Sequence, residues 1–327
     1  MALLFCDSFD HYTTLTQKWT SASASIAAGA GRNGTACLAG NNGNATRTIS
    51  PTSTLIAGAA FKFNQIGGSN DLILFNDGSS RQIDVRLTTT GGIQVTRNGT
   101  QLSATTGVSL SAGVWYFIEF KATIHNTSGA YEVRLGGVTV LSATGVDTAS
   151  TSNDYASAVV LYAPGLFGTA HTDDFYLCDD SGATNNSFLG DVRVIPVVPD
   201  GAGNYAQWTP STGSNHQCVD ESAPNSDTDY VSSSTAGHKD SYSFGSVGVT
   251  GDVKGVQVLG FVRKDDAGSR TVRPFSRISG TDYNGTSVSV SDSYAYLREV
   301  LETNPATSSA WTTAEIDGAE FGVELVS

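Results

Sequence analysis

The chain has 327 residues, a formal net charge of −13 at pH 7 and 15% charged residues, and 36 of its residues are glycine. Such an acidic chain lacks the basic face that nucleic acids require, and it is poorly suited to an anionic membrane surface. The length predicts two domains, and the composition favours short strands joined by turns over long helices.

The N-terminal end shows no recognisable targeting segment. Its first six residues are apolar, but Asp7 follows them, and this run is too short for the core of a signal peptide. No stretch approaches the roughly 20 apolar residues of a membrane span. We therefore expect a protein that is made in the cytoplasm and is not secreted by a signal peptide.

The first part of the chain is predicted to be strands almost throughout. Short apolar runs at residues 58–63 and 71–75 precede residues 82–87, where polar and apolar residues alternate as in a strand with one solvated face. Asn98 and Gly99 predict a tight hairpin turn. Further strands are predicted at residues 114–120, 131–135, 138–141, 158–162 and 174–178. This length and spacing are typical of a sandwich or jelly roll.

A polar, glycine-containing stretch at residues 181–187 predicts a linker between domains at residues 1–180 and 188–327. The second domain is expected to open with a strand at residues 188–198, limited by its prolines. More strands are predicted at residues 253–262, 271–278, 287–290 and 321–326. Helix is expected only at residues 294–301, or as a short turn at residues 312–316 that Thr312 caps.

Four segments of the first domain resemble the concanavalin A-like (laminin-G-like) jelly roll. They are an opening segment with Asp7, Phe9 and Trp19, a Gly-x-Trp-x-x-hydrophobic-Glu pattern that begins at Gly113, and residues 131–137 and 173–177. They follow the family's order and cover residues 1 to about 180.

This resemblance implies an all-β protein, in which a concanavalin A-like jelly-roll sandwich precedes a second, smaller β-sandwich-like domain. The strand that begins near Trp115 is then expected to pack between two sheets. Because side chains alternate along a strand, we expect Trp115 and Phe117 to face the core, and Tyr116 and Ile118 to face the other side.

The combination of such a unit with residues 188–194 resembles virion proteins of tailed bacteriophages. Residues 208–211, 219–221 and 311–323 continue the resemblance. It implies a structural protein on the outside of a phage particle, in a tail, a fibre or a capsid decoration. Its partners are then other virion proteins, further copies in a trimer or hexamer, and glycans of the host surface. No nucleic acid or membrane is expected as a partner.

A glycan hydrolase is a minor alternative that depends on Glu315, Asp317 and Glu320. Concanavalin-like retaining glucanases carry Glu-x-Asp-x-x-Glu on one strand, and the resemblance would make Glu315 the nucleophile, Asp317 its orienting partner and Glu320 the acid/base. The pattern lies outside the first domain, and only seven residues follow Glu320. Acidic residues at a solvated turn are therefore the favoured interpretation, and we expect no enzyme.

Asp173 and Asp174 are candidate calcium ligands, because laminin-G-like domains often bind calcium at the ends of loops. Calcium needs six to eight oxygens, however, and adjacent aspartates supply few of them. The same applies to a second acidic group, Asp220, Glu221, Asp227 and Asp229. The five histidines share no ligand spacing and the four cysteines form no Cys-x-x-Cys pair, so no other cofactor is expected.

Four aromatic residues near predicted loops are candidates for stacking on sugar rings: Tyr155, Tyr162, Tyr205 and Trp208. Packing in a core or against another subunit is the commoner role for each. A carbohydrate-binding module is thus a further alternative to a virion protein, and the fold alone does not decide between them.

Overall fold

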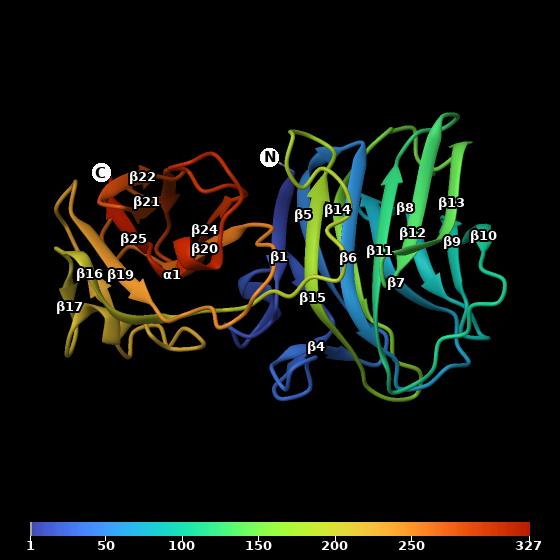
Figure 1. The fold of residues 1–327 in the computed structure, drawn as a ribbon, viewed down its shortest axis with the longest axis horizontal. Helices are drawn as coiled ribbons and strands as arrows, with labels where there is room; N and C mark the ends of the chain where they lie inside the picture. The colour runs from blue at the N-terminus through green and yellow to red at the C-terminus, as the bar shows by residue number, and fades with distance from the viewer. Residues whose placement is uncertain (1) are drawn as a thin grey trace. The chain divides into compact units, whose positions relative to one another are not determined.

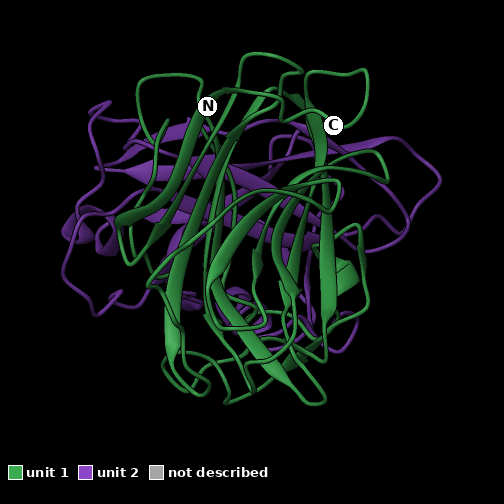
Figure 2. Cartoon of the chain, turned by 90° about the vertical axis from the view of Figure 1, so that its right-hand side faces the viewer, with its two compact units in different colours: residues 1–194 green, residues 195–327 purple. Residues whose placement is uncertain are grey.

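The computed structural model describes residues 2–327, and the chain forms two compact units, residues 1–194 and residues 195–327 (Figure 2). Strands make up nearly all of the regular structure. The expected all-β fold, a jelly-roll sandwich followed by a smaller β-sandwich-like unit, is confirmed.

Two antiparallel sheets form the first unit (Figure 1). The eight-stranded sheet has the order β13-β12-β11-β6-β15-β4-β3, with β1 paired to β15. Its strands are β1 (Leu3–Asp7), β3 (Ser25–Ala27), β4 (Cys37–Gly40), β6 (Thr54–Lys62), β11 (Trp115–Thr123), β12 (Gly129–Leu135), β13 (Val138–Val146) and β15 (Ala170–Asp179).

The seven-stranded sheet has the order β10-β9-β8-β7-β14-β5-β2. Its strands are β2 (Ser21–Ala22), β5 (Gly43–Thr52), β7 (Asn70–Asp77), β8 (Ser80–Leu87), β9 (Ile93–Arg97), β10 (Thr100–Ala104) and β14 (Ala156–Ala163). The predicted hairpin at Asn98 and Gly99 joins β9 to β10, and both residues have the positive φ that such a turn requires.

The core of the first unit lies between its two sheets. Phe75 of β7 stacks on Phe120 of β11, with ring centroids 5.0 Å apart, and neither side chain is exposed. Along β8, the buried Ile83 and Val85 alternate with Asp84 and Arg86. One face of the seven-stranded sheet therefore packs on the core, while its outer face carries polar side chains.

The opening motif of the chain forms a buried network around Asp7. This carboxylate accepts hydrogen bonds from the Tyr12 hydroxyl at 2.5 Å, the Trp19 ring N–H at 2.7 Å and Lys18 Nζ at 2.9 Å. Burial favours a raised pKa, but the Lys18 and His11 charges and the hydrogen bonds outweigh it and lower the pKa of Asp7. The motif thus contains a buried, paired carboxylate, and its hydrogen bonds connect β1 to residues 12–19.

The expected orientation of β11 is wrong. Phe120 faces the core, so Trp115 and Phe117, which are an odd number of residues away, lie on the outer face of the eight-stranded sheet. Phe117 is nevertheless only 4% exposed. Arg32 lies over its ring, at 5.6 Å from the centroid, and Tyr176 stacks beside it. Alternation could not identify the core side because both faces of this strand are covered.

Residues 186–194 help to cover this outer face, and we call them the strap. The strap has no strand or helix, which corrects the strand expected at residues 188–198. Leu189 N donates to the Tyr176 hydroxyl at 3.2 Å, and Gly190 N donates to Glu119 at 2.8 Å. Val194 N donates to Asp174 at 2.9 Å. The strap therefore belongs to the first unit, and the boundary lies after Val194, not at residues 181–187.

The second unit contains a six-stranded sheet in the order β16-β19-β25-β21-β22, with β23 paired to β21. Two further pairs, β17-β18 and β20-β24, complete it. The strands are β16 (Pro199–Ala206), β17 (Thr209–Pro210), β18 (Val231–Ser232), β19 (Lys239–Phe244), β20 (Val256–Val262), β21 (Arg270–Ile278), β22 (Thr281–Asn284), β23 (Val288–Val290), β24 (Ala295–Leu301) and β25 (Glu320–Leu325). Its core includes Phe321, Trp311 and Ile278.

The helix expected at residues 294–301 is strand β24, which pairs in full register with β20. Pairing and burial of Leu297 and Val300 therefore override the helix-forming residues of this segment. The predicted helical turn exists as α1 (Thr313–Asp317), and Thr312 caps it. Among residues 2–327, no helix has the length and apolar character to cross a membrane.

Candidate functional site

A charged cluster lies on the outer face of the seven-stranded sheet. Asp84 and Arg86 point outward from β8 because Ile83 and Val85 point to the core. Arg81 joins them, because the β7-β8 register shifts between Phe75 and Asn76. We call Asp71, Arg81, Asp84, Arg86 and Tyr162 the Asp84 cluster.

Asp71 and Asp84 are bridged by two arginines. The Arg81 guanidinium donates two hydrogen bonds to Asp71, each 2.9 Å long, and its Nη2 lies 3.1 Å from Asp84 Oδ2. Arg86 Nε lies 2.6 Å from Asp71 Oδ1 and 3.5 Å from Asp84 Oδ2. Thr96, opposite Asp84 on β9, donates a 2.6 Å hydrogen bond to its Oδ1.

The carboxylates lie beneath the arginines. The Asp84 side chain is unexposed and that of Asp71 is 9% exposed, compared with 28% for Arg81 and 22% for Arg86. Burial raises the pKa of Asp84 to about 6, although the Thr96 hydrogen bond and the Arg81 charge oppose the shift. Burial and the charges of Asp71 and Asp84 raise the pKa of Tyr162. The arginine side chains are therefore the more exposed charged groups of the cluster.

An exposed aromatic side chain marks the same end of the sheet. Phe167, in the loop between β14 and β15, is 90% exposed and has a φ of 55°. A bulky residue rarely adopts this left-handed conformation, which costs on the order of 1 kcal/mol. Such strain persists only where the surrounding structure fixes the backbone.

Two asparagines hold the Phe167 loop. Asn64 accepts from Leu166 N at 3.0 Å and donates to Leu166 O at 2.9 Å. Asn70 donates to Pro164 O at 3.0 Å, and it directly precedes Asp71 of the cluster. A Cβ at Gly165 would lie 2.2 Å from Gly168 O, so this position accepts only glycine. The loop is thus fixed to the end of β7 where the cluster begins.

Among the four predicted sugar-stacking residues, only Tyr162 belongs to the Asp84 cluster. Tyr155 is half-buried, and its carbonyl accepts a 3.0 Å hydrogen bond from Gln82. Trp208 packs on the core of the second unit, and its ring N–H donates to His238 O at 3.1 Å.

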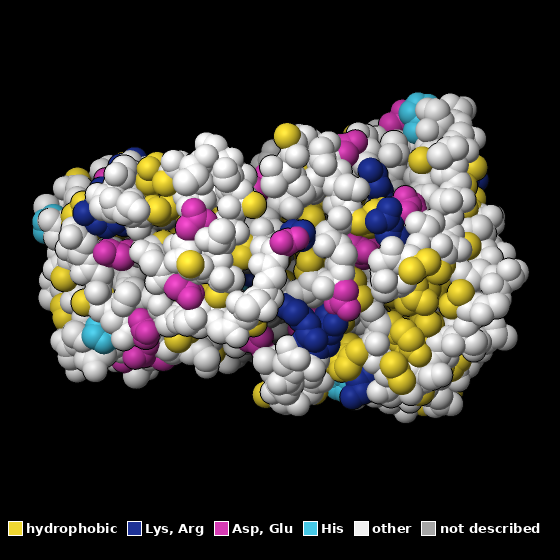
Figure 3. Space-filling view, in the orientation of Figure 1, with side chains coloured by type: hydrophobic (Ala, Val, Ile, Leu, Met, Phe, Trp, Pro, Cys, Tyr) yellow, Lys and Arg dark blue, Asp and Glu magenta, His cyan; other side chains and the backbone are white. Residues whose placement is uncertain are grey.

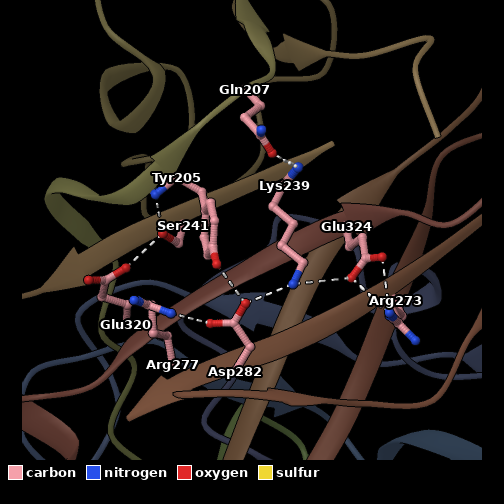
Figure 4. Close-up of polar contacts among 9 residues, drawn as sticks. All are labelled: Tyr205, Gln207, Lys239, Ser241, Arg273, Arg277, Asp282, Glu320 and Glu324. Atoms are coloured by element: carbon pink, nitrogen blue, oxygen red, sulfur yellow. Dashed lines mark hydrogen bonds and ion pairs between the residues drawn. The ribbon is translucent and has the colours of Figure 1, made fainter. Parts of the chain in front are cut away.

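Tyr205 lies in an ion-pair network on the second unit's six-stranded sheet (Figure 4). Its hydroxyl donates to Asp282 at 2.9 Å, and the Lys239 and Arg277 cations each lie 5.3 Å from its ring centroid. Lys239 and Arg277 also bond Asp282, at 2.7 and 2.6 Å. Arg273 pairs with Glu324 on the neighbouring strand at 2.9 Å. The charges of this network are paired with one another, and the Tyr205 ring already has cationic partners.

The three carboxylates of the hydrolase alternative do not share a strand. Glu315 is in α1 and accepts from Thr312 N at 2.8 Å, completing a capping box. Asp317 accepts from Val247 N at 2.9 Å, and Glu320, at the start of β25, accepts from Asn204 N at 2.7 Å. The one-strand arrangement that the glucanase resemblance requires is therefore wrong, and each carboxylate has its own local partner.

The two calcium candidates bind protein groups. Asp173 accepts from Arg32 N at 2.8 Å, and Asp174 bonds the Arg32 guanidinium at 3.0 Å. Burial and the charge of Asp174 raise the pKa of Asp173 to about 7. In the other acidic group, Asn225 donates to Glu221 at 2.7 Å and also to Asp229. Across residues 2–327, no three His, Cys, Asp or Glu side chains are arranged to hold a metal ion.

Sequence reasoning missed Asp71, Arg81, Asp84, Arg86 and Phe167 as site residues. Two signals were present. The alternating strand at residues 82–87 placed Asp84 and Arg86 on one solvated face. Leu166 and Phe167, which lie between two glycines, marked an apolar loop. Neither signal shows that the two features meet, because this depends on the pairing of β7, β8 and β14.

No family model and no curated protein matches the chain. Solved structures with a similar fold include the alginate lyase Aly36B, at 12% identity and a TM-score of 0.40, over 54% of this chain and 96% of that chain. Trypanosoma rangeli sialidase in complex with 2,3-difluorosialic acid matches at 12% identity and a TM-score of 0.34, over 43% of this chain and 25% of that chain.

A third similar structure is domain 4 of AbnA, an extracellular arabinanase from Geobacillus stearothermophilus, in complex with arabinotriose. It matches at 13% identity and a TM-score of 0.35, over 53% of this chain and 93% of that chain. Likeness at this level says nothing about what the present chain binds.

Proposed function

We propose that the protein is a non-catalytic carbohydrate-binding protein, and that the glycan binds at the end of the seven-stranded sheet marked by Phe167 and Tyr162. The observation that carries this proposal is Phe167, which is 90% exposed on a loop that holds it in a strained conformation. Sugar sites combine an exposed aromatic face with a few fixed polar groups. The Asp84 cluster supplies such groups beside this loop.

Burial argues against hydrolysis at this site. Two carboxyl groups, one of them with a raised pKa, are the usual requirement for a glycosidase. Asp84 has the raised pKa, but its side chain is unexposed and Thr96 and Arg81 surround its oxygens. A general acid must reach the leaving oxygen of the substrate, so we assign no catalytic role to Asp84.

The placement of the protein on a tailed-phage particle stays a prediction that rests on the sequence resemblance. A glycan site is compatible with it, because virion surface proteins contact host glycans in that hypothesis. The trimer or hexamer also stays a prediction.

A glycan array with the purified full-length chain tests the proposal. We expect retention of a defined set of glycans, and at least a tenfold weaker affinity for Phe167→Ala in calorimetric titrations. The matched control is Tyr230→Ala, which removes a 43% exposed aromatic side chain from the second unit and should leave affinity unchanged. No retention of any glycan, or equal affinity of Phe167→Ala and the wild type, would contradict the proposal.

A further inference from the structure

The Nε atom of Arg86 and its two terminal nitrogens, Nη1 and Nη2, have different surroundings. Its Nε faces the two buried carboxylates, 2.6 Å from Asp71 and 3.5 Å from Asp84. Among residues 2–327, no hydrogen bond involves its Nη1 or Nη2, and neither atom is fully buried. Since the Arg86 side chain is 22% exposed, Nη1 and Nη2 are the part of the guanidinium that is available to a ligand.

The environment fixes the direction of this guanidinium. Asp71 and Asp84 lie beside Nε as ion-pair partners, although Nε makes no hydrogen bond, and Gln94 is the cross-strand neighbour of Arg86 on β9. Gln94 is itself held by a 3.2 Å hydrogen bond to Ser69. A guanidinium that is oriented in advance loses little conformational entropy when it binds, and its two terminal amino groups match the two oxygens of a carboxylate.

The local charge also favours an anion. The carboxylates of the Asp84 cluster are at most 9% exposed, whereas the side chains of Arg81 and Arg86 are 28% and 22% exposed. A ligand that approaches this face therefore meets cations, although the chain as a whole has a net charge of −13. Asp84, with its raised pKa, adds less negative charge than an ordinary aspartate as the pH falls toward 6.

We propose that the glycan bound at this site is acidic, and that Arg86 binds a sugar carboxylate through its two terminal amino groups. This inference rests on the proposed function and adds the class of ligand. Phe167 would contribute affinity for any sugar ring, whereas Arg86 would discriminate between acidic and neutral glycans. The two residues therefore have separable effects.

The test begins with an array that contains both uronic or sialic acid glycans and neutral glycans. We expect the full-length protein to retain acidic glycans and to lose them as the salt concentration rises. The best binder is then compared with its methyl ester, which keeps the ring but removes the charge. The acid should bind at least tenfold more tightly than the ester.

Variants separate the inference from the proposed function. Arg86→Gln should bind the acid as weakly as the ester, Arg86→Lys should restore part of the preference, and Phe167→Ala should weaken both ligands. The control is Arg263→Gln, which removes a 32% exposed guanidinium in the second unit. Retention of neutral glycans as strong as that of acidic glycans, or a preference for the acid that survives in Arg86→Gln, overturns the inference and leaves the proposed function standing. Absence of any glycan binding overturns the proposed function itself.

Discussion

At the scale of single residues, burial decides what each charged group can do. Asp7 and Asp84 are both unexposed carboxylates in the first unit, but their pKa values move in opposite directions. Asp7 accepts hydrogen bonds from Lys18, Tyr12 and Trp19, which stabilise its charge. Asp84 accepts one hydrogen bond, from Thr96, and its Oδ2 accepts none. The two buried aspartates therefore differ because Asp7 has the Lys18 charge and donors for both oxygens, whereas Asp84 has one donor and the like charge of Asp71 beside it.

Asp84 should make the protein less stable as the pH rises from about 4 to about 6. Its pKa is raised from 3.8 to about 6, so the folded chain holds this proton more tightly than the unfolded chain does. The contribution is complete below pH 4 and is lost as the pH rises through 6. A shift of this size corresponds to at most about 3 kcal/mol. Asp84→Asn should remove this part of the pH dependence of the unfolding free energy.

Denaturant titrations from pH 4 to pH 8 measure the effect. The stability of Asp84→Asn relative to the wild type should improve with pH and become constant above pH 7. The control is Asp180→Asn, which changes an exposed aspartate and should follow the wild type at every pH. A constant difference between Asp84→Asn and the wild type over this range would show that Asp84 has no raised pKa.

At the scale of secondary-structure elements, the strap shows how a segment without regular structure becomes part of a sheet. Arg32 bonds Asp174 of β15 at 3.0 Å, and it bonds Asp191 and Val192 O of the strap at 2.8 and 3.3 Å. It also covers Phe117. One guanidinium thus satisfies a buried carboxylate, shields an aromatic ring and holds the strap.

Replacement of Arg32 should therefore loosen the strap and destabilise the first unit. Arg32→Ala leaves Asp174, whose side chain is 6% exposed, with only Arg193 at 3.8 Å as an arginine partner, and loss of such a buried pair costs up to about 3 kcal/mol. Hydrogen exchange at Gly190 and Val194, whose amides donate to Glu119 and Asp174, should become faster. Arg97→Ala, which breaks a partly exposed pair with Asp147 in the same unit, should change stability by less than about 1 kcal/mol. Unchanged exchange in Arg32→Ala would mean that the strap is held without this residue.

The sequence predicts individual strands and turns better than it predicts which strands pair with one another. Alternation in residues 82–87 and the Asn98-Gly99 turn predicted β8 and the β9-β10 hairpin, because these signals are local. The segment at residues 294–301 was misassigned because its structure depends on pairing with β20. The Asp84 cluster was missed for the same reason, since Asp71, Asp84 and Tyr162 come from three strands.

At the scale of the whole molecule, each unit has a core of its own. Phe75 and Phe120 belong to the core of the first unit, while Trp311, Ile316 and Phe321 form a core cluster in the second unit. No strand of one unit belongs to a sheet of the other among the described residues. Two separate cores predict two units that can fold independently.

The boundary after Val194 can be tested with two fragments of the first unit. A fragment of residues 1–194 should unfold cooperatively with the stability that the first unit has in the full chain. A fragment that ends at residue 187 should be less stable, because it lacks the Leu189 and Gly190 amides that bond Tyr176 and Glu119. Each such hydrogen bond contributes about 1 kcal/mol, and bonds to a charged group contribute more.

Thermal and denaturant unfolding of the two fragments and the full chain measure this difference. We expect the fragment of residues 1–187 to lose at least about 2 kcal/mol relative to residues 1–194, since a buried Glu119 without Gly190 N is poorly satisfied. Glu119→Gln in the shorter fragment serves as the control, because removal of the buried charge should recover part of the loss. Equal stability of the two fragments would return the boundary to residues 181–187 and make the strap part of the connection between the units.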